Sequence, residues 1–189
     1  MTTFDVPLVP QQTAKSCWAA SVTMLLSWAQ QSSIDPAALT DIPGFQEAYE
    51  VKGLGLKTAR IALATWGLVA EPPQDYSAQG FAYLLDSYGP LFVAAHVIIG
   101  DRIVNHSRVI TGFDQDNDTV YINDPWGADM PSFVATNPGS QYTLTYEALL
   151  EQMDSLARMM YAKAERDDPT NQLGDLAFVA HLPARPPNL

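Results

Sequence analysis

The first half of the chain carries apolar residues at helical spacing. One such stripe begins after Ser16 and lies on a single helix face: Trp18, Val22, Leu25, Leu26 and Ala29. Ser16 is suited to cap this helix, because its hydroxyl can accept a free N–H of the first turn. We therefore expect Cys17 to lie at a helix N-terminus.

Further helices are predicted before residue 90. Residues 34–45 are interrupted by two prolines and a glycine, and they hold one short helix. Residues 57–66 form a helix that Gly67 ends. Ser77 caps another helix, which ends at Gly89. The N-terminal half is therefore predicted to be mostly helical.

The pattern changes after residue 90. The runs 91–99, 108–113 and 119–122 are apolar and rich in β-branched residues. A polar turn over 114–118 joins the last two runs. The three runs therefore predict an antiparallel meander.

The C-terminal part repeats both patterns on a smaller scale. Residues 142–144 predict a short strand, and Thr145 is suited to cap a helix that runs from 146 to about 156. Residues 177–182 predict a last strand.

These elements predict an α+β fold in a single domain over residues 1–182. A helical lobe over about 16–89 is expected to pack on an antiparallel sheet lobe over about 90–182. The cleft between them is a natural site. Residues 183–189 form a Pro-rich tail, which we expect to be disordered.

The amino-acid composition narrows the classes of partner that the protein can bind. Ten basic and 21 acidic residues give a net charge of −11, which argues against binding nucleic-acid phosphates or an anionic membrane. The charge would suit a basic target or inhibitor. The N-terminus has neither the basic nor the apolar region of a signal peptide, and no apolar run is long enough for a membrane helix.

The chain has one cysteine, Cys17, so no intrachain disulfide can form. A lone cysteine is most often a small buried apolar residue. The predicted helix N-terminus changes this interpretation, because the helix dipole stabilises the thiolate that acts as a nucleophile. Cys17 is therefore a candidate nucleophile.

A nucleophilic thiol needs a base, and the chain has three histidines. His96 lies in a strongly apolar run and His181 lies beside the tail, so both are interpreted as structural. His106 lies where a loop is expected to enter a strand. That position suits a side chain that faces a cleft from a rigid scaffold.

A catalytic histidine also needs an acceptor on its second nitrogen. If 106–113 and 119–123 form a hairpin, Asn123 and Asp124 lie beside His106. Hairpin geometry leaves both residues open as the acceptor.

An acyl-transfer site also needs donors for the oxyanion. Gln11 precedes Cys17 by six residues, and its amide is the predicted donor together with the Cys17 N–H. Gln12 is the near alternative. Trp18 and Trp126 are possible cleft-lining residues, and Trp126 could equally pack beneath the site.

These motifs resemble those of papain-like cysteine peptidases. The run Gln-Gln-Thr-Ala-Lys-Ser-Cys-Trp-Ala-Ala over 11–20 has Gln six before Cys and Trp directly after it. His-Ser-Arg-Val-Ile-Thr-Gly-Phe over 106–113 and Asn-Asp-Pro-Trp-Gly over 123–127 resemble the bacterial C39-like and AvrRpt2-like effector branch. The resemblance spans about residues 6–127.

The resemblance implies a papain-like fold and a thiol protease that cleaves peptide bonds through a triad. In the bacterial branch the third member is the Asp of the Asp-Pro pair, which corresponds to Asp124. Classical papains use an Asn, for which Asn123 is the alternative. Cys17 and His106 stand 89 residues apart, fewer than the roughly 130–150 of papains, which suggests a minimal core.

The resemblance also suggests a biological setting. The chain resembles a bacterial secreted effector or interbacterial toxin, which is made in the cytoplasm, delivered into a target cell, and matched by a cognate immunity protein. Alternatives are a C39-like leader peptidase that cuts after Gly-Gly, and a papain-fold deamidase, transglutaminase or peptidoglycan amidase. A binding module with a vestigial triad is the non-enzymatic alternative.

No cofactor or metal is expected. Residues 114–118 begin like a calcium loop, but Thr119 stands where the EF-hand pattern needs Gly. A single Cys with scattered His residues gives no zinc pattern.

Overall fold

The computed structural model describes residues 1–128, 130–167 and 177–187. The strands are β1 (Thr2–Thr3), β2 (Val69–Ala70), β3 (Leu91–Ile99), β4 (Arg102–Asp114), β5 (Thr119–Asp124), β6 (Ser140–Thr145) and β7 (Val179–His181). The helical elements are α1 (Cys17–Gln30), the 3-10 helix η1 (Pro36–Asp41), α2 (Phe45–Glu47), the π-helix η2 (Ala48–Lys52), α3 (Leu56–Thr65), α4 (Ala78–Tyr88) and α5 (Tyr146–Asp167).

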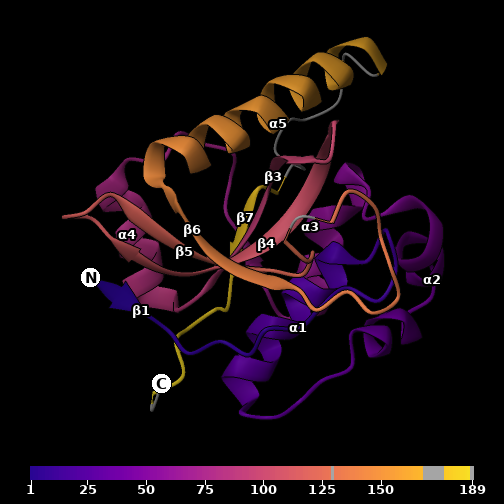
Figure 1. Cartoon of the computed structure of the whole chain (residues 1–189), viewed down its shortest axis with the longest axis horizontal. Helices are drawn as coiled ribbons and strands as arrows, with labels where there is room; N and C mark the ends of the chain where they lie inside the picture. The colour runs from indigo at the N-terminus through magenta and orange to yellow at the C-terminus, as the bar shows by residue number, and fades with distance from the viewer. Residues whose placement is uncertain (129, 168–176, 188–189) are drawn as a thin grey trace.

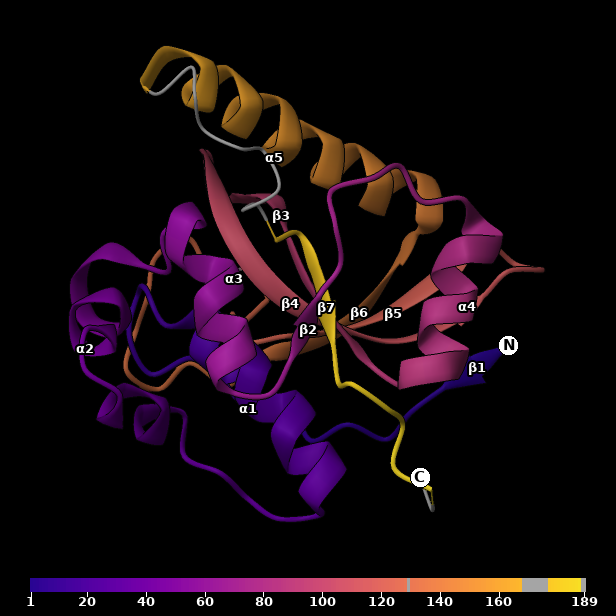
Figure 2. The ribbon, with the colours of Figure 1, turned by 180° about the vertical axis from the view of Figure 1, so that it is seen from behind.

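The strands form one antiparallel sheet in the order β2-β7-β3-β4-β5-β6, with β1 paired to β4. Helix α5 lies across one side of this sheet, and α1 lies on the opposite side (Figures 1 and 2). This combination of helices and an antiparallel sheet confirms the predicted α+β class.

Two apolar cores lie on the two sides of the sheet. One core joins α4 and α5 to residues such as Val93 and Ile110 on the central strands. The other joins α1 and α3 to Phe92 and Val109. Because residues next to each other in a strand point to opposite faces, the same two strands supply both cores.

Helix α4 departs from the predicted arrangement. The helical lobe was expected to extend over about 16–89. Helix α4 instead packs with α5, in a different core from the helices around α1. Its apolar residues Phe81, Leu84 and Leu85 recur at helical spacing, so the pattern predicts a helix without showing which face of the sheet it covers.

Most predicted elements are present, with shifted ends. Strand β3 has the predicted bounds, and Ser77 caps α4 by accepting the Gly80 N–H at 3.1 Å. Helix α5 continues eleven residues past its expected end. Strand β7 covers only residues 179–181 of the predicted run 177–182. The predicted tail lies within the described residues as far as 187.

The strands β1 and β2 were not predicted. Each has two residues and is held by a partner far away in the sequence: β1 by β4, and β2 by β7. Such short segments carry no alternating pattern, so only tertiary pairing reveals them.

Strand β4 begins earlier than predicted, at Arg102. His106 therefore lies inside this strand, paired with Ala95 of β3, and does not lie at the entrance from a loop. The first residues of β4, from Arg102 to Val104, are largely exposed and include both polar and apolar side chains. The hydrophobic run that predicts a strand starts only after them.

Candidate active site

Cys17 is the first residue of α1, as the sequence predicts. Ser16 does not cap the helix with its side chain. Its Oγ instead accepts the N–H groups of Gln12 and Thr13 at 3.1 and 2.9 Å, which closes a tight turn before the helix. The Cys17 side chain is half-buried, and the first N–H groups of the helix surround it with positive potential.

His106 and Asp124 lie on the neighbouring strands β4 and β5. His106 Nε2 is 2.6 Å from Asp124 Oδ1, and both side chains are buried. Because a carboxylate only accepts, Nε2 carries a proton. The antiparallel pairing of β4 with β5 brings together residues that stand 18 apart in the sequence.

His106 also hydrogen bonds to the side chain of Cys17. Since Nε2 faces Asp124, the nitrogen that faces the sulfur is Nδ1. The N–H of Ser107 donates to the same sulfur. The structure thus brings Cys17, His106 and Asp124 into one continuous chain of contacts.

These contacts set the charge of the pair. Burial raises the pKa of Cys17, but hydrogen bonding and charge from His106 and the Ser107 N–H outweigh it and lower the pKa below its usual value. Burial lowers the pKa of His106, but Asp124 and Cys17 together raise it to about 9. The pair therefore favours the thiolate–imidazolium form.

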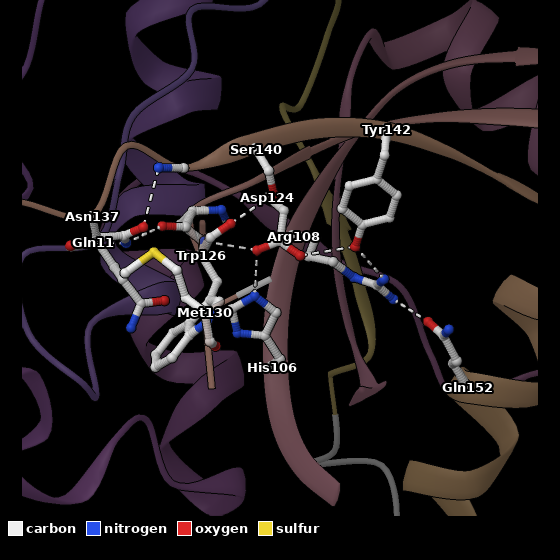
Figure 3. A network of polar contacts seen from close by, with 12 residues as sticks. Gln11, His106, Arg108, Asp124, Trp126, Met130, Asn137, Ser140, Tyr142 and Gln152 are labelled. Atoms are coloured by element: carbon white, nitrogen blue, oxygen red, sulfur yellow. Dashed lines mark hydrogen bonds and ion pairs between the residues drawn. The ribbon is translucent and has the colours of Figure 1, made fainter. Parts of the chain in front are cut away.

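Asp124 is held in its ionised form by several groups. Burial raises its pKa, while His106, the Trp126 N–H and the charge of Arg108 lower it to below the usual range. The Trp126 N–H donates to Oδ1 at 2.8 Å, and the Tyr142 hydroxyl donates to Oδ2 at 2.8 Å. Both oxygens are thus fixed in place (Figure 3).

The residues behind Asp124 were missed by the sequence predictions. Arg108, which is 1% exposed, donates to the Tyr142 hydroxyl at 3.0 Å and to Gln152 of α5 at 2.6 Å (Figure 3). One signal was available. Arg108 stands next to the apolar Val109 and Ile110 in a predicted strand, and a charge buried there needs partners.

Gln11 lies beside Cys17 in the same cleft and is 3% exposed. Its Nε2 donates to the Thr13 carbonyl at 2.8 Å, which leaves one N–H of the amide for another acceptor. Asn137, which was also missed, donates to the Pro125 carbonyl at 2.6 Å. The Gln11 N–H reaches the same carbonyl at 3.0 Å, so the two segments are tied together.

The two alternatives make other contacts. Gln12 donates to Asp35 at 2.9 Å and accepts the Tyr49 hydroxyl at 2.6 Å. Asn123 donates to the Val6 carbonyl at 2.8 Å and accepts from Gln141 at 2.8 Å. None of these described contacts of Gln12 and Asn123 is with Cys17 or His106.

The two tryptophans have different surroundings. Trp18 lines the cleft, but it is 1% exposed and stacks on Trp66 with ring centroids 5.2 Å apart. Trp126 is half-buried, and its Nε1 donates to the Met130 carbonyl at 2.8 Å. Trp126 lines the cleft and also a second hollow beside it.

The other two histidines make contacts away from Cys17. His96 Nδ1 is 2.8 Å from the Ser155 hydroxyl of α5. His181 Nε2 is 2.9 Å from Glu71, and its ring stacks on Tyr88 with centroids 3.8 Å apart. Neither contact involves Cys17.

The cleft has a volume of about 550 Å³, and Cys17 and His106 both line it. Within the described residues, no three His, Cys, Asp or Glu side chains are grouped as metal ligands. No helix in the part of the chain that the structure describes has the length and apolar character needed to cross a membrane.

The chain was compared with known families. A family model described as papain-like cysteine protease AvrRpt2 matches residues 1–137. The matched segment contains Gln11, Cys17, His106 and Asp124. No curated protein sequence matches the chain.

Proposed function

Since the chain belongs to the AvrRpt2 family of papain-like cysteine proteases, and is therefore a hydrolase, we propose that it is an endopeptidase with Cys17 as nucleophile. His106 is the general base and acid, and Asp124 orients it. The observation that carries this proposal is that one buried imidazole pairs with the Asp124 carboxylate at 2.6 Å and lines the same cleft as Cys17, whose pKa it lowers.

The first step forms an acyl-enzyme. The Cys17 thiolate attacks the scissile carbonyl carbon, and the carbonyl electron pair moves to the oxygen. The free N–H of Gln11 and the Cys17 backbone N–H stabilise that oxyanion. His106 then gives its Nδ1 proton to the leaving amine as the carbon–nitrogen bond breaks.

The second step releases the product. His106, now neutral, takes a proton from water, and the resulting hydroxide attacks the thioester carbonyl. The carbon–sulfur bond breaks, the carboxyl product leaves, and Cys17 returns to the thiolate paired with His106. Asp124 stabilises the imidazolium throughout, because its charge and its hydrogen bond are in place before the reaction.

The proposal is tested by mapping new protein N-termini in a proteome digested with the wild-type chain and with Cys17→Ala. We expect new termini only with the wild type. Removal of the nucleophile leaves no acyl acceptor, so the rate should fall by roughly 10³-fold or more. Circular dichroism of the variant checks that it is folded.

The rival reactions predict different products. A deamidase or transglutaminase would create glutamate residues or cross-links without new termini, and a peptidoglycan amidase would release sugar-linked peptides. If wild-type protein makes no new termini while Cys17 still reacts rapidly with an epoxide inhibitor, the protease assignment fails. If Cys17 reacts no faster than a free thiol, the binding module with a vestigial triad replaces all of these enzymatic functions.

We propose further that the protein acts after delivery into another cell, as a bacterial effector or toxin with a cognate immunity protein. Membership of the AvrRpt2 family supports this setting. Expression in a heterologous cell tests it: wild-type protein should be harmful and Cys17→Ala should not. Equal growth with both would contradict the toxin role.

A further inference from the structure

A second hollow lies directly beside the cleft, on the other side of Trp126. It has a volume of about 490 Å³ and shares three wall residues with the cleft: Ile99, Trp126 and Pro131. Its other lining combines the polar residues Asp124, Ser140 and Tyr142 with the apolar residues Val97, Ile98, Gly100, Gly127, Ala128 and Met130. A chain lying across Cys17 would therefore continue over Trp126 into this hollow.

The tip of the β3–β4 hairpin forms the rim of both spaces. Ile98 and Ile103 are direct partners across the two strands, so their side chains lie on the same face. They are 77% and 68% exposed. Two large apolar side chains thus lie side by side in water at the edge of the cleft. Covering them with another apolar group would be favourable, because it removes apolar surface from water.

The lining of the second hollow favours an uncharged side chain over a charged one. Among its described lining residues, Asp124 supplies the formal charge, and that carboxylate is already bonded to His106, Tyr142 and the Trp126 N–H. A charged side chain entering here would lose water and find no free partner. An apolar side chain loses nothing comparable.

We propose that this hollow and the Ile98–Ile103 pair bind an apolar stretch of the polypeptide substrate close to the scissile bond. The inference rests on the proposed endopeptidase function. The occupant is the substrate itself, because the hollow is continuous with the cleft that contains Cys17 and His106.

The test uses internally quenched peptides in pairs, identical except for isoleucine or serine at each position flanking the scissile bond. The wild type should cleave the isoleucine peptides about tenfold faster at one or more positions. Ile98→Asp and Ile103→Asp should each remove that preference, so that the isoleucine and serine peptides are cleaved at the same rate. Ile61→Asp on α3 is the matched control, since Ile61 is also 68% exposed.

Two further measurements separate the possible failures. Alkylation of Cys17 by iodoacetamide should proceed at the same rate in all four proteins, which shows that the reactive pair is intact. Binding of the same peptides to Cys17→Ala, followed by fluorescence anisotropy, tests the hollow without hydrolysis. Binding without cleavage would contradict the endopeptidase function alone. Equal binding of both peptide series, or an equal loss with Ile61→Asp, would overturn the apolar subsite.

A different observation concerns Asp124. Arg108 donates to the Tyr142 hydroxyl, and that hydroxyl donates to Asp124 Oδ2. The direction is fixed because a guanidinium only donates and an ionised carboxylate only accepts. Arg108 follows His106 by two residues in β4, so both side chains lie on the same face of the sheet.

We infer that Tyr142 and Arg108 are positioning residues that hold the second oxygen of Asp124, and so aim the first at His106. The charged and titratable groups facing Asp124 are His106, Arg108 and Tyr142. Arg108 acts on Asp124 directly through its charge and also through the Tyr142 hydroxyl, to which it donates.

Tyr142→Phe and Arg108→Lys test this inference. Each should lower kcat for a cleaved peptide by about tenfold with little change in KM. Tyr142→Phe should also move the acid limb of the pH–rate profile to higher pH, because Asp124 loses a hydrogen bond that favours its ionised form. Arg108→Lys keeps a charge without the two-pronged donor set, so it separates charge from geometry.

Tyr146→Phe is the matched control, because it removes a tyrosine hydroxyl that donates to the Tyr76 carbonyl at 2.9 Å, away from Asp124. It should lower the melting temperature without moving the pH profile. If Tyr142→Phe also changes only the melting temperature, the positioning role is wrong.

Discussion

At the residue scale, the charge on two side chains decides when the site can react. The pKa of Cys17 is lowered and that of His106 is raised to about 9, so the thiolate and the imidazolium exist together over the pH range between the two values. The pKa of His106 is raised first by Asp124 and then by Cys17, whereas the pKa of Cys17 is lowered by His106 and the Ser107 N–H.

This predicts different pH profiles for two reactions of Cys17. Alkylation by iodoacetamide needs only the thiolate, so its rate should rise below pH 8.5 and then stay level. Peptide hydrolysis also needs the His106 proton for the leaving amine, so its rate should fall again as pH rises through about 9. Stopped-flow alkylation and a peptide assay over the same buffers measure the two curves.

His106→Gln supplies the control for the first curve. Without the imidazole, burial is left to raise the pKa of Cys17, so the alkylation midpoint should move above the usual value of about 8.5. An unchanged midpoint would show that His106 does not activate the thiol.

Gln11 and Gln12 form a natural pair for testing the oxyanion site. Gln11→Ala should lower kcat by roughly 10²-fold, because it removes a donor that strengthens only as the oxyanion forms. Gln12→Ala should leave kcat within about twofold, since its described contacts are with Asp35 and Tyr49. Equal effects on a cleaved peptide would remove Gln11 from the proposed mechanism.

At the element scale, strand β4 determines the geometry of the site. It carries His106 and Arg108, pairs with β3 along one edge and with β5 along the other, and has an irregularity between Ile110 and Gly112. Its last part is also the partner of β1. A change in the last part of β4 is therefore expected to disturb its pairing with β1.

Gly112→Ala tests how closely these segments pack. A Cβ at this position would lie 2.6 Å from the Thr2 carbonyl oxygen and 3.0 Å from Thr3 Cα, which are backbone atoms that cannot turn away. We expect a loss of about 1–3 kcal/mol in the free energy of unfolding, measured with urea. Below the transition, alkylation of Cys17 should persist because His106 lies six residues away along the strand.

Gly80→Ala on α4 is the comparison of opposite sign. Its new Cβ would meet the Ser77 hydroxyl at 3.3 Å, a side chain that can adjust, and alanine favours a helix over glycine by about 1 kcal/mol. If both substitutions lower the free energy of unfolding equally, tight packing of β1 on β4 is not the cause.

At the scale of the whole molecule, the two cores share one sheet. Val109 belongs to the core around α1, and the adjacent Ile110 belongs to the core around α5. A strand cannot leave one core and remain in the other, because each strand has two faces. This agrees with the prediction of one domain over 1–182, whose boundaries stay a prediction.

The shared sheet predicts that both cores unfold together. Leu25→Ala in one core and Leu149→Ala in the other should each lower the free energy of unfolding by about 2–5 kcal/mol, since both side chains are fully buried. In both variants, tryptophan fluorescence and circular dichroism should give a single coincident urea transition. Two separated transitions, one for each core, would contradict a cooperative domain.

The local predictions depended on short patterns, and these were sufficient for many features. The apolar stripe after Ser16 predicted α1 with Cys17 at its start, and the polar turn over 114–118 predicted the β4–β5 hairpin. That hairpin alone suggested an acceptor near His106, where Asp124 lies at 2.6 Å. The family also followed from sequence, because the motifs around Cys17, His106 and Asp124 were enough to recognise it.

The remaining features required contacts between distant segments. Hairpin spacing left Asn123 and Asp124 equivalent. The sheet separates them by turning Asn123 to Val6 and Asp124 to His106, since successive residues point to opposite faces. The burial of Arg108 against Tyr142 and Gln152 joins three segments that no local pattern relates.

The sequence by itself determined which residues can supply a nucleophile, a base and an acceptor, because those properties belong to side-chain types and to local spacing. Only the tertiary structure decided the charge state of Cys17. The pKa of this thiol depends on its burial and on His106, which stands 89 residues away in the sequence but lies beside Cys17 in the fold. The tertiary structure also decided the shape of the cleft and the hollow beyond Trp126, because both are enclosed by loops and strands that meet only when the chain is folded.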